Sequence, residues 1–317
     1  MIFRALGFLT LMVGWALVAA TGLAIWLHYY PSRGDLALYL TSAVPFALVA
    51  GAVAILLFAA FRRWFMLLIA LVVTAGVAFT QAPLFIARTA PTGGEPITVM
   101  SSNVLFGGAD IDELAERVRS EDVDFLSLQE VTAETLDRVR RSSIGAQLPH
   151  IHAIPGVYAA GTAMLSRFPL TEQAEVPDTV LRNLTARTDL PGAPATQMLA
   201  LHPAAPLRGK VHYWVEDMEK LDAHLAAMPG GRAIAAGDFN STWDHARFRG
   251  LLRHGFQDAT DQSGAGFQPS YPTDRLGHRP FIAIDHVIVR GFVATSLHTF
   301  TLSGSDHRSV VVTLVPS

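Results

Sequence analysis

Three short motifs in the last third of the sequence combine acidic residues with asparagine or histidine. Each stands beside an apolar run of the kind that forms a strand; they are Gly237-Asp238-Phe239-Asn240, Ile284-Asp285-His286 and Ser305-Asp306-His307. Carboxylates supply hard oxygen ligands for a divalent cation and can orient a water molecule, while an imidazole can meet the charge of a phosphate. Metal-assisted hydrolysis of a phosphoester requires this combination of groups, so the motifs predict that chemistry.

Three more polar residues follow apolar runs earlier in the chain, namely Asn103, Glu130 and His202. The run before Glu130 is nearly all apolar, so a carboxylate at its end is costly to bury unless a cation or a hydrogen bond compensates it. We therefore expect Glu130 to be the main metal ligand. Asn103 offers a neutral oxygen to the cation or to a water bound to it, although asparagine at this place can equally form a turn.

Hydrophobic patterning places these residues in an α/β domain. Strands are predicted over residues 97–100, 123–128, 161–166, 197–201, 232–236, 281–289 and 308–315. Asp110, with Glu113 three residues later, predicts the start of one helix, and residues 215–228 predict another. Residues 258–280 predict a long loop over the site. The polar motifs are expected at the carboxyl ends of strands, where the active sites of layered α/β folds gather.

The order of these motifs resembles the endonuclease/exonuclease/phosphatase superfamily, whose members include DNase I-like nucleases, inositol-phosphate 5-phosphatases and neutral sphingomyelinases. The resemblance covers residues 97–317, and the residues that carry it are Asn103, Glu130, His202, Asp238, Asn240, Asp285, Asp306 and His307. It implies a four-layer α/β/β/α sandwich, in which two mixed sheets pack face to face between helices.

The Asp238–Asn240 pair is expected to act on the nucleophile. The two residues are two apart, so an extended backbone points both side chains the same way. The resemblance implies that Asp238 orients or deprotonates the attacking water. It also implies that Asn240 forms a hydrogen bond with the nucleophile or with the phosphate.

The histidines are expected to meet the phosphate and the leaving group. His307 must be cationic to bind a phosphate oxygen, and a buried carboxylate beside it raises the pKa of an imidazole, for which Asp285 is the candidate. Asp306 would complete the metal shell or orient a water. His202 would stabilise charge or protonate the leaving oxygen. His286 follows Asp285 along a strand, so it is expected to face the other side and pack in the interior.

The assembled mechanism is in-line attack by water on phosphorus. One Mg²⁺ or Mn²⁺ ion neutralises the developing charge, and no covalent intermediate forms. The pattern leaves open whether a second metal ion takes part.

Residues 1–87 are expected to form a membrane anchor. Half of the whole chain is hydrophobic and only 16% is charged, and the excess of apolar residues lies in three uncharged stretches, about residues 5–27, 36–61 and 64–87. Each stretch exceeds the ~20 residues that a helix needs to cross ~30 Å of hydrocarbon. We therefore predict three transmembrane helices. A cleaved signal peptide is the alternative for the first stretch, but two further spans follow it.

Flanking positive charges predict the orientation of this anchor. Arg4 precedes the first span and the Arg62-Arg63 pair joins the second to the third. The positive-inside rule then places the amino terminus in the cytoplasm and, after three spans, the rest of the chain outside. Residues 88–96 predict a short linker, so the domain over residues 97–317 would lie close to the bilayer.

Composition narrows the substrate class only in part. Residues 96–317 contain 19 Lys and Arg against 25 Asp and Glu, which is not the basic footprint of a protein that binds duplex DNA without specificity. Cysteine is absent, which excludes disulfides and thiolate zinc sites. We expect a phosphodiester substrate, either nucleic acid or lipid-linked, and no protein partner can be inferred. The alternative is a catalytically silent membrane protein whose extracytoplasmic domain binds a partner or a phosphorylated ligand.

Overall fold

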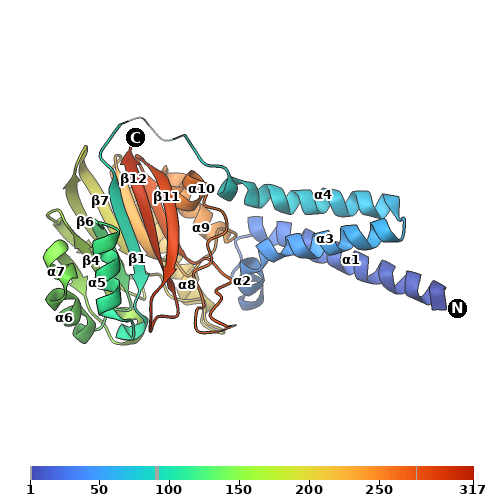
Figure 1. Cartoon of the computed structure of the whole chain (residues 1–317), viewed down its shortest axis with the longest axis horizontal. Coiled ribbons are helices and arrows are strands. Elements are labelled where there is room, and N and C mark those ends of the chain that lie inside the picture. The colour runs from blue at the N-terminus through green and yellow to red at the C-terminus, as the bar shows by residue number, and fades with distance from the viewer. Residues whose placement is uncertain (1, 90–92, 276) are drawn as a thin grey trace. The chain divides into compact units, whose positions relative to one another are not determined.

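The computed structural model of the protein describes residues 2–89, 93–275 and 277–317. The chain divides into two compact units (Figure 1). Unit 1 comprises residues 1–83 with 244–246, and unit 2 comprises residues 84–243 with 247–317. The predicted linker and the predicted loop over the site each include residues outside the described ranges, namely 90–92 and 276.

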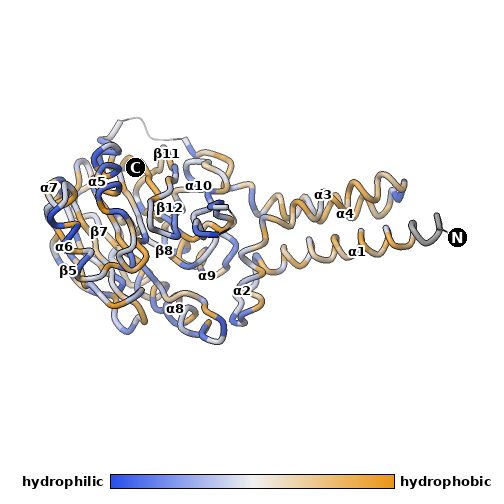
Figure 2. The backbone as a smooth tube through the Cα atoms, turned by 60° about the horizontal axis from the view of Figure 1, so that its bottom comes forward, coloured by the Kyte–Doolittle hydropathy of each residue, from blue (hydrophilic) through white to orange (hydrophobic). Residues whose placement is uncertain are grey.

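Unit 1 is helical and apolar along most of its length (Figure 2). Its elements are α1 (Ile2–Tyr29), α2 (Asp35–Ser42), the 3₁₀ turn η1 (Val44–Phe46), α3 (Ala47–Ala60) and α4 (Trp64–Gln81). Gly7–Tyr29 and Trp64–Phe85 are long and apolar enough to cross a membrane. Helix α2 and the η1–α3 segment are bent by 56° relative to one another, and they form a third candidate span if the bent pair counts as one. Pro45 in η1 explains the bend, because proline has no N–H to continue the helix from α2.

Unit 2 contains two six-stranded mixed sheets. Sheet A has the order β11-β12-β1-β2-β4-β3, with bounds Phe292–Thr301, Arg308–Pro316, Ile97–Asn103, Phe125–Gln129, Thr162–Ser166 and His150–Ile154. Sheet B has the order β5-β6-β7-β8-β10-β9, with bounds Thr171–Glu175, Leu184–Leu190, Ala193–Leu201, Ala233–Asp238, Asp285–Arg290 and Gln257–Asp258. The pairs β1–β2 and β7–β8 are parallel, and the other pairs are antiparallel.

Helices accompany both sheets. They are α5 (Ile111–Ser120), α6 (Ala133–Arg141), α7 (Ser143–Gln147), α8 (Val211–Ala227), α9 (Ala246–Leu251) and α10 (Ala259–Ser263). Short 3₁₀ turns cover Ala82–Phe85 (η2), Leu105–Gly107 (η3), Tyr158–Ala160 (η4) and Leu252–His254 (η5). Figure 1 shows α5, α6 and α7 beside sheet A. Helix α8 is tied to the end of β8 in sheet B, because the Trp214 indole donates a hydrogen bond to the Ser241 hydroxyl just after that strand.

Alternation along the central strands builds two apolar layers. Val99 of β1 and Phe125 of β2 point into the core between the sheets, where they join residues of β7, β8, β10 and β12. Met100 and Leu126, one position further, point outward and pack with α5, α6 and α7. Successive side chains of a strand point to opposite faces, so a strand that is buried on both faces contributes to an apolar layer on each side. The prediction of an α/β fold with two sheets between helices is confirmed.

The elements differ from the predicted ones mainly at the sheet edges. Strands β3, β5, β6, β9 and β11 and helices α6, α7, α9 and α10 were not predicted, and α10 lies within the predicted loop over residues 258–280. The predicted start of a helix at Asp110 is confirmed, since its carboxylate accepts hydrogen bonds from the N–H groups of Asp112 and Glu113. Glu113 does not return the bond to Asp110; its carboxylate accepts from the Ser303 N–H at 3.1 Å.

The chain enters unit 2 before the predicted linker. The Leu84 carbonyl accepts from the Gly266 N–H, and the Arg88 N–H donates to the Gln262 carbonyl, both at 2.8 Å. The Arg88 guanidinium also lies 2.9 Å from the Asp261 carboxylate. Residues 84–88 are therefore already attached to the domain.

Candidate active site

The predicted site residues gather at one end of the two sheets. Asn103 ends β1, Asp238 ends β8, and Glu130 directly follows β2. Asp285 instead begins β10, and His307 directly precedes β12. The prediction that all motifs lie at carboxyl ends is wrong for these two. They reach the same end because β10 and β12 run antiparallel to β8 and β1, so that Asp285 is in register with Asp238.

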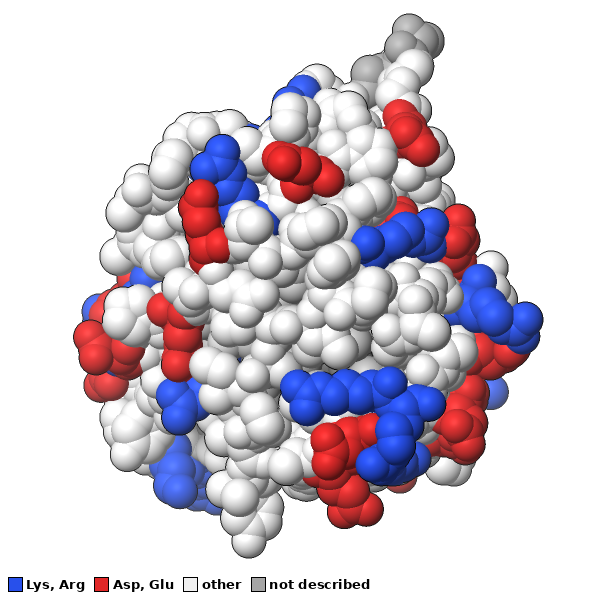
Figure 3. Space-filling view, turned by 90° about the vertical axis from the view of Figure 1, so that its left-hand side faces the viewer, with Lys and Arg blue, Asp and Glu red and all other residues white. Residues whose placement is uncertain are grey.

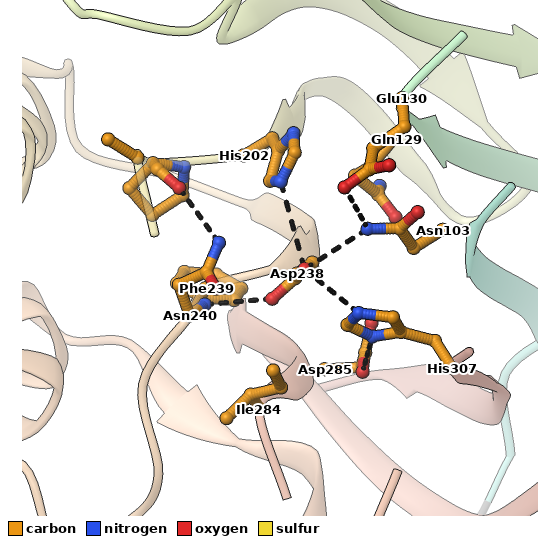
Figure 4. A network of polar contacts seen from close by, with 12 residues as sticks. Asn103, Gln129, Glu130, His202, Asp238, Phe239, Asn240, Ile284, Asp285 and His307 are labelled. Carbon is orange, nitrogen blue, oxygen red and sulfur yellow. Dashed lines mark hydrogen bonds and ion pairs between the residues drawn. The ribbon is translucent and has the colours of Figure 1, made fainter. Parts of the chain in front are cut away.

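Asp238 lies at the centre of the cluster (Figure 4). Its Oδ2 atom accepts from the Asn103 amide at 3.2 Å and lies 3.6 Å from His307 Nε2 and 3.7 Å from His202 Nε2. Its Oδ1 atom accepts from the Asn240 N–H at 2.8 Å. Side chains from three other motifs thus converge on one buried carboxylate.

Glycine at position 237 permits this convergence. A Cβ atom there would lie 1.9 Å from the Leu201 carbonyl oxygen, so any other residue would push β8 away from β7. His202 follows Leu201, and the close approach of these strands therefore sets its distance from Asp238.

Glu130 is held in a strained and shielded position. Its backbone φ is +63°, a left-handed value that is uncommon for residues other than glycine. Burial raises the pKa of its carboxyl to about 7, with the Asn103 hydrogen bond opposing and the Asp238 charge adding to the rise. Its Oε2 atom has no hydrogen-bond partner among the described residues. A cation would supply the missing compensation.

Asn103 joins the two carboxylates as a donor. Its amide nitrogen donates to Glu130 Oε1 at 3.1 Å as well as to Asp238, and its oxygen accepts from the Leu105 N–H at 3.0 Å. In this arrangement the nitrogen, and not the oxygen, faces the carboxylates. Its role as an oxygen ligand remains a prediction.

His307 and Asp285 form a buried ion pair. His307 Nδ1 lies 2.8 Å from Asp285 Oδ2, and the Tyr271 ring packs against the imidazole at 4.7 Å between centroids. Burial alone would lower the pKa of His307, but the Asp285 and Asp238 carboxylates outweigh it and raise the pKa to about 10. The imidazole is therefore cationic at neutral pH, with Nε2 turned toward Asp238.

His202 is also buried, but its electrostatic surroundings differ. Burial lowers the pKa of its imidazole. The Asp238 carboxylate and the main chain of Ala159 act in the opposite direction but do not outweigh burial. Asn183, which was not predicted, accepts from the His202 N–H at 2.7 Å and donates to its carbonyl at 3.5 Å. No motif in the sequence marks Asn183, because it acts through the backbone of another residue.

Asn240 departs from the reasoning based on an extended strand. β8 ends at Asp238, and Asn240 has a φ of +49°, so the chain turns between the two residues. The Asn240 amide donates to the Pro203 carbonyl at 3.0 Å, which ties this turn to the segment after His202 (Figure 4).

His286 faces away from the site, as predicted. Its Nδ1 atom lies 3.0 Å from the Asp258 carboxylate and its Nε2 atom 2.9 Å from the Ser241 carbonyl, while its ring packs on Phe248. Burial would lower the pKa of His286, but Asp258 outweighs it and raises the pKa. Because both partners are acceptors, the imidazole donates from both nitrogens. It thereby holds the turn that follows Asp238 from behind.

The donor set fits a hard divalent cation. Four carboxylates, those of Glu130, Asp238, Asp285 and Asp306, surround the cationic His307. Among the described residues, Asp285 Oδ1 and Asp306 Oδ1 have no hydrogen-bond partner, nor has Glu130 Oε2. Buried carboxylate oxygens in excess of positive charge suit Mg²⁺ or Mn²⁺.

Two arrangements of ligands can be drawn from these atoms. Ligand atoms of Asp238, Asp285 and His307 lie within 4.8 Å of one another. However, His307 is a cation whose Nδ1 hydrogen is held by Asp285, and a protonated imidazole does not bind metal. A metal site formed by Glu130, Asn103 and Asp306 stays our prediction.

Comparison with known proteins agrees with this fold. Residues 100–307 match the model of the Endonuclease/Exonuclease/phosphatase family. None of the curated proteins matches the chain. The chain is similar to three solved structures, at identities that show the fold alone. They are an AP endonuclease from Archaeoglobus fulgidus (12% identity, TM-score 0.57, covering 68% of this chain and 98% of that one), D. rerio TDP2 complexed with single strand DNA product (16%, 0.56, 69% and 99%) and an endonuclease/exonuclease/phosphatase from Beutenbergia cavernae (20%, 0.53, 70% and 72%).

Replacing Asp285 with Asn should lower the pKa of His307. In the metal-free protein, NMR titration of the imidazole should give a pKa of about 10 for the wild type and a clearly lower one for the variant, because the nearest carboxylate charge is lost. The raised pKa means that the charged imidazole stabilises the fold fully below pH 6.5, and that this contribution is lost as the pH rises through about 10. An unchanged titration in Asp285→Asn would remove Asp285 as the cause.

Replacing Glu130 with Gln should weaken Mg²⁺ binding. In the wild type the melting temperature should rise with Mg²⁺, and the affinity should increase with pH around 7, since the cation displaces the carboxyl proton. We expect Glu130→Gln to need at least about tenfold more Mg²⁺ for the same rise in melting temperature, because one contact with the cation is lost. Glu134→Gln, at an exposed position in the first turn of α6, is the matched control. Identical Mg²⁺ titrations for the two variants would exclude Glu130 as a ligand.

Proposed function

The chain belongs to the Endonuclease/Exonuclease/phosphatase family, and on that premise we propose that it is a divalent-metal-dependent hydrolase of phosphodiesters. The observation that carries the proposal is the convergence of Asn103, His202 and His307 on the buried carboxylate of Asp238, to which the Asn103 amide also joins Glu130 (Figure 4). Groups that are far apart in the sequence would not be buried together at this cost without a ligand to compensate them.

The residues divide the reaction among them. Asp238, between two imidazoles, orients the attacking water and takes up its proton. The cationic His307 binds a non-bridging phosphate oxygen, and Asp285 keeps its ring oriented and charged. His202, largely neutral because burial lowers its pKa, is placed to hydrogen-bond the leaving oxygen.

The backbone turn after Asp238 and the acidic side chains complete the site. Asn240 positions the nucleophile or the phosphate from that turn. Glu130 and Asp306, with Asn103 beside them, would hold Mg²⁺ or Mn²⁺, which neutralises charge that develops on the phosphate. The alternative of a silent binding protein is less well supported, because it offers no reason for a cationic imidazole beside a carboxylate that can orient water.

The substrate class is a phosphodiester. The similar TDP2 structure is complexed with a single strand DNA product, which supports a nucleic acid substrate. The net acidic composition of residues 96–317 supports a substrate that carries fewer charges. On the face in Figure 3, charges of both signs are interspersed, and across the described residues of that face they form no continuous basic stripe.

We also propose that the apolar helices anchor the enzyme in the cell membrane. α1, α4 and the bent α2–α3 pair would form three spans, in agreement with their length and hydropathy. With Arg4 and Arg62-Arg63 in the cytoplasm, the catalytic domain lies outside it.

Replacing Asp238 with Ala should abolish hydrolysis. With the full chain in detergent micelles and Mg²⁺, turnover of bis(p-nitrophenyl) phosphate should fall by about 1,000-fold, within the range of 10²–10⁴ for loss of a general base. Asp137→Ala, at an exposed position of α6, is the matched control and should retain activity. Near-full turnover by Asp238→Ala, at an unchanged melting temperature, would refute the assignment. A panel of DNA, RNA, phospholipid and inositol phosphates then gives the natural class.

Reporter fusions should place the catalytic domain outside the cytoplasm. Alkaline phosphatase fused after Ser317 should be active, because this enzyme folds only outside, and the same reporter fused after Arg63 should be inactive. The opposite pattern would reverse the orientation. Activity at both positions would contradict a span between them.

A further inference from the structure

Exposed apolar side chains stand on the loops that border the candidate active site. Phe106, Val157 and Tyr158 are 46%, 75% and 77% exposed, and Val180 on a neighbouring loop is exposed as well. We call these four residues the apolar rim. Single exposed apolar residues are common on proteins, but a group of them beside a site marks a surface that contacts something.

The loop of Phe106 is part of the structure that orients Asn103. The Leu105 N–H donates to the Asn103 side-chain oxygen at 3.0 Å, and Phe106 is the next residue. Leu105 and Phe106 have φ values of +43° and +53°. Bulky residues rarely adopt this left-handed conformation, and here it presents the Phe106 ring to solvent beside the site.

The loop of Tyr158 is attached to the segments of Glu130 and His202. The Gly156 N–H donates to the Val131 carbonyl at 2.9 Å, and the Val131 N–H donates to the Gly161 carbonyl at 3.0 Å. Val131 directly follows Glu130, and the main chain of Ala159 lies against the His202 imidazole. Tyr158, also left-handed with a φ of +53°, therefore lies on a loop that is bonded to both of these segments.

Phe106 and Tyr158 meet across the gap between their loops. Their ring centroids are 6.3 Å apart and their planes cross at 87°, an edge-to-face contact. On the third loop, Val180 is linked to the segment after His202, because the Asp217 carboxylate accepts from the N–H groups of Val180 and Ala204 at 2.8 and 2.9 Å. The rim thus borders the polar cluster from loops that hydrogen bonds hold in place.

The charge of the rim argues against a polyanion. Residues 104–108 and 155–160 contain no charged side chain, and the one guanidinium that the described residues place against the Phe106 loop is that of Arg138, which donates to the Gly107 carbonyl at 3.5 Å. On the third loop, Arg182 is paired with Glu175 at 2.9 Å. A nucleic acid strand carries a phosphate on every nucleotide, and proteins that bind it meet these charges with Lys and Arg. An apolar rim beside one phosphate site instead suits a molecule whose single phosphate carries one apolar group.

We propose that the apolar rim binds the diacylglycerol group of a membrane phospholipid, and that such a lipid is the substrate class of the site. The inference rests on the proposed phosphodiesterase activity. In the reaction, the oxygen of water forms a bond to phosphorus, one P–O ester bond breaks, and the released alcohol takes up the proton that water gives up. The rim holds the apolar group that flanks the scissile bond.

Two soluble diesters with the same leaving group test the contact. Bis(p-nitrophenyl) phosphate has a second aromatic ring, and methyl p-nitrophenyl phosphate has a methyl group in its place. For the full chain in detergent micelles with Mg²⁺, Phe106→Ala and Tyr158→Ala should each lower the ratio of kcat/KM for the first over the second by about tenfold, as expected for an aromatic contact. Phe106→Tyr and Tyr158→Phe keep a ring and should keep the ratio.

Two outcomes would overturn the contact. Equal losses on both diesters would show that the loops serve only the fold or the placement of Asn103 and His202. An unchanged ratio would show that the rings do not touch substrate. If the wild type hydrolysed neither diester, the proposed function itself would fail, which is a different result from a loss of the ratio.

Natural substrates test the lipid class. The wild type should release the headgroup alcohol from vesicles of phosphatidylcholine and phosphatidylglycerol and leave phosphatidic acid, because the rim holds the diacylglycerol that stays on the phosphate. Tyr158→Ala should slow this release while Tyr158→Phe does not. A single-stranded oligodeoxynucleotide should be a poorer substrate. Efficient cleavage of the oligonucleotide that depends on Phe106 and Tyr158, with no hydrolysis of the vesicles, would overturn the lipid assignment in favour of base stacking.

Discussion

The structure depends on an imbalance of buried charge. Glu130, Asp238, Asp285 and Asp306 lie around one cationic imidazole, that of His307. Carboxylates shielded from water are costly unless positive charge or hydrogen bonds compensate them, and here oxygens of three of them have no partner among the described residues. This imbalance supports our proposals that the site binds a divalent cation and that the His307 imidazolium binds a phosphate oxygen. Hydrogen bonds between the two sheets and around the site keep these groups in place.

The two sheets supply that rigidity. Ser127 of β2 donates to the Ala236 carbonyl of β8 at 2.9 Å, which joins the central strands of the two sheets just below the site. Ser305 donates to the Asn103 carbonyl at 2.7 Å and accepts from the His307 N–H, so the last motif is tied to β1. Behind the site, His286 holds the turn after Asp238. Catalytic groups on strand ends supported in this way lose little freedom when a substrate binds.

The site separates two tasks by position. The floor is polar and buried, and we propose that it stabilises the charge on the phosphate. The rim is apolar and exposed, and we propose that it contacts the apolar group of the substrate. Left-handed backbone occurs at Glu130 and Asn240 on the floor and at Phe106 and Tyr158 on the rim, as well as at residues away from the site. Such strain persists where surrounding contacts impose it and where function uses it.

The sequence by itself determined which residues form the site, the apolar helices, and the strands that lead to Asn103, Glu130 and Asp238, because these depend on local patterning and on residue type. It did not show β5, whose residues are mostly exposed and polar, or the left-handed turn at Asn240. Asn183 and Asp258 could not be predicted from the sequence, because they act only through His202 and His286, which are distant from them in the chain. The tertiary structure also decided which way the Asn103 amide points and which histidine is cationic. Hydrogen-bond direction and desolvation depend on neighbours that folding alone brings together.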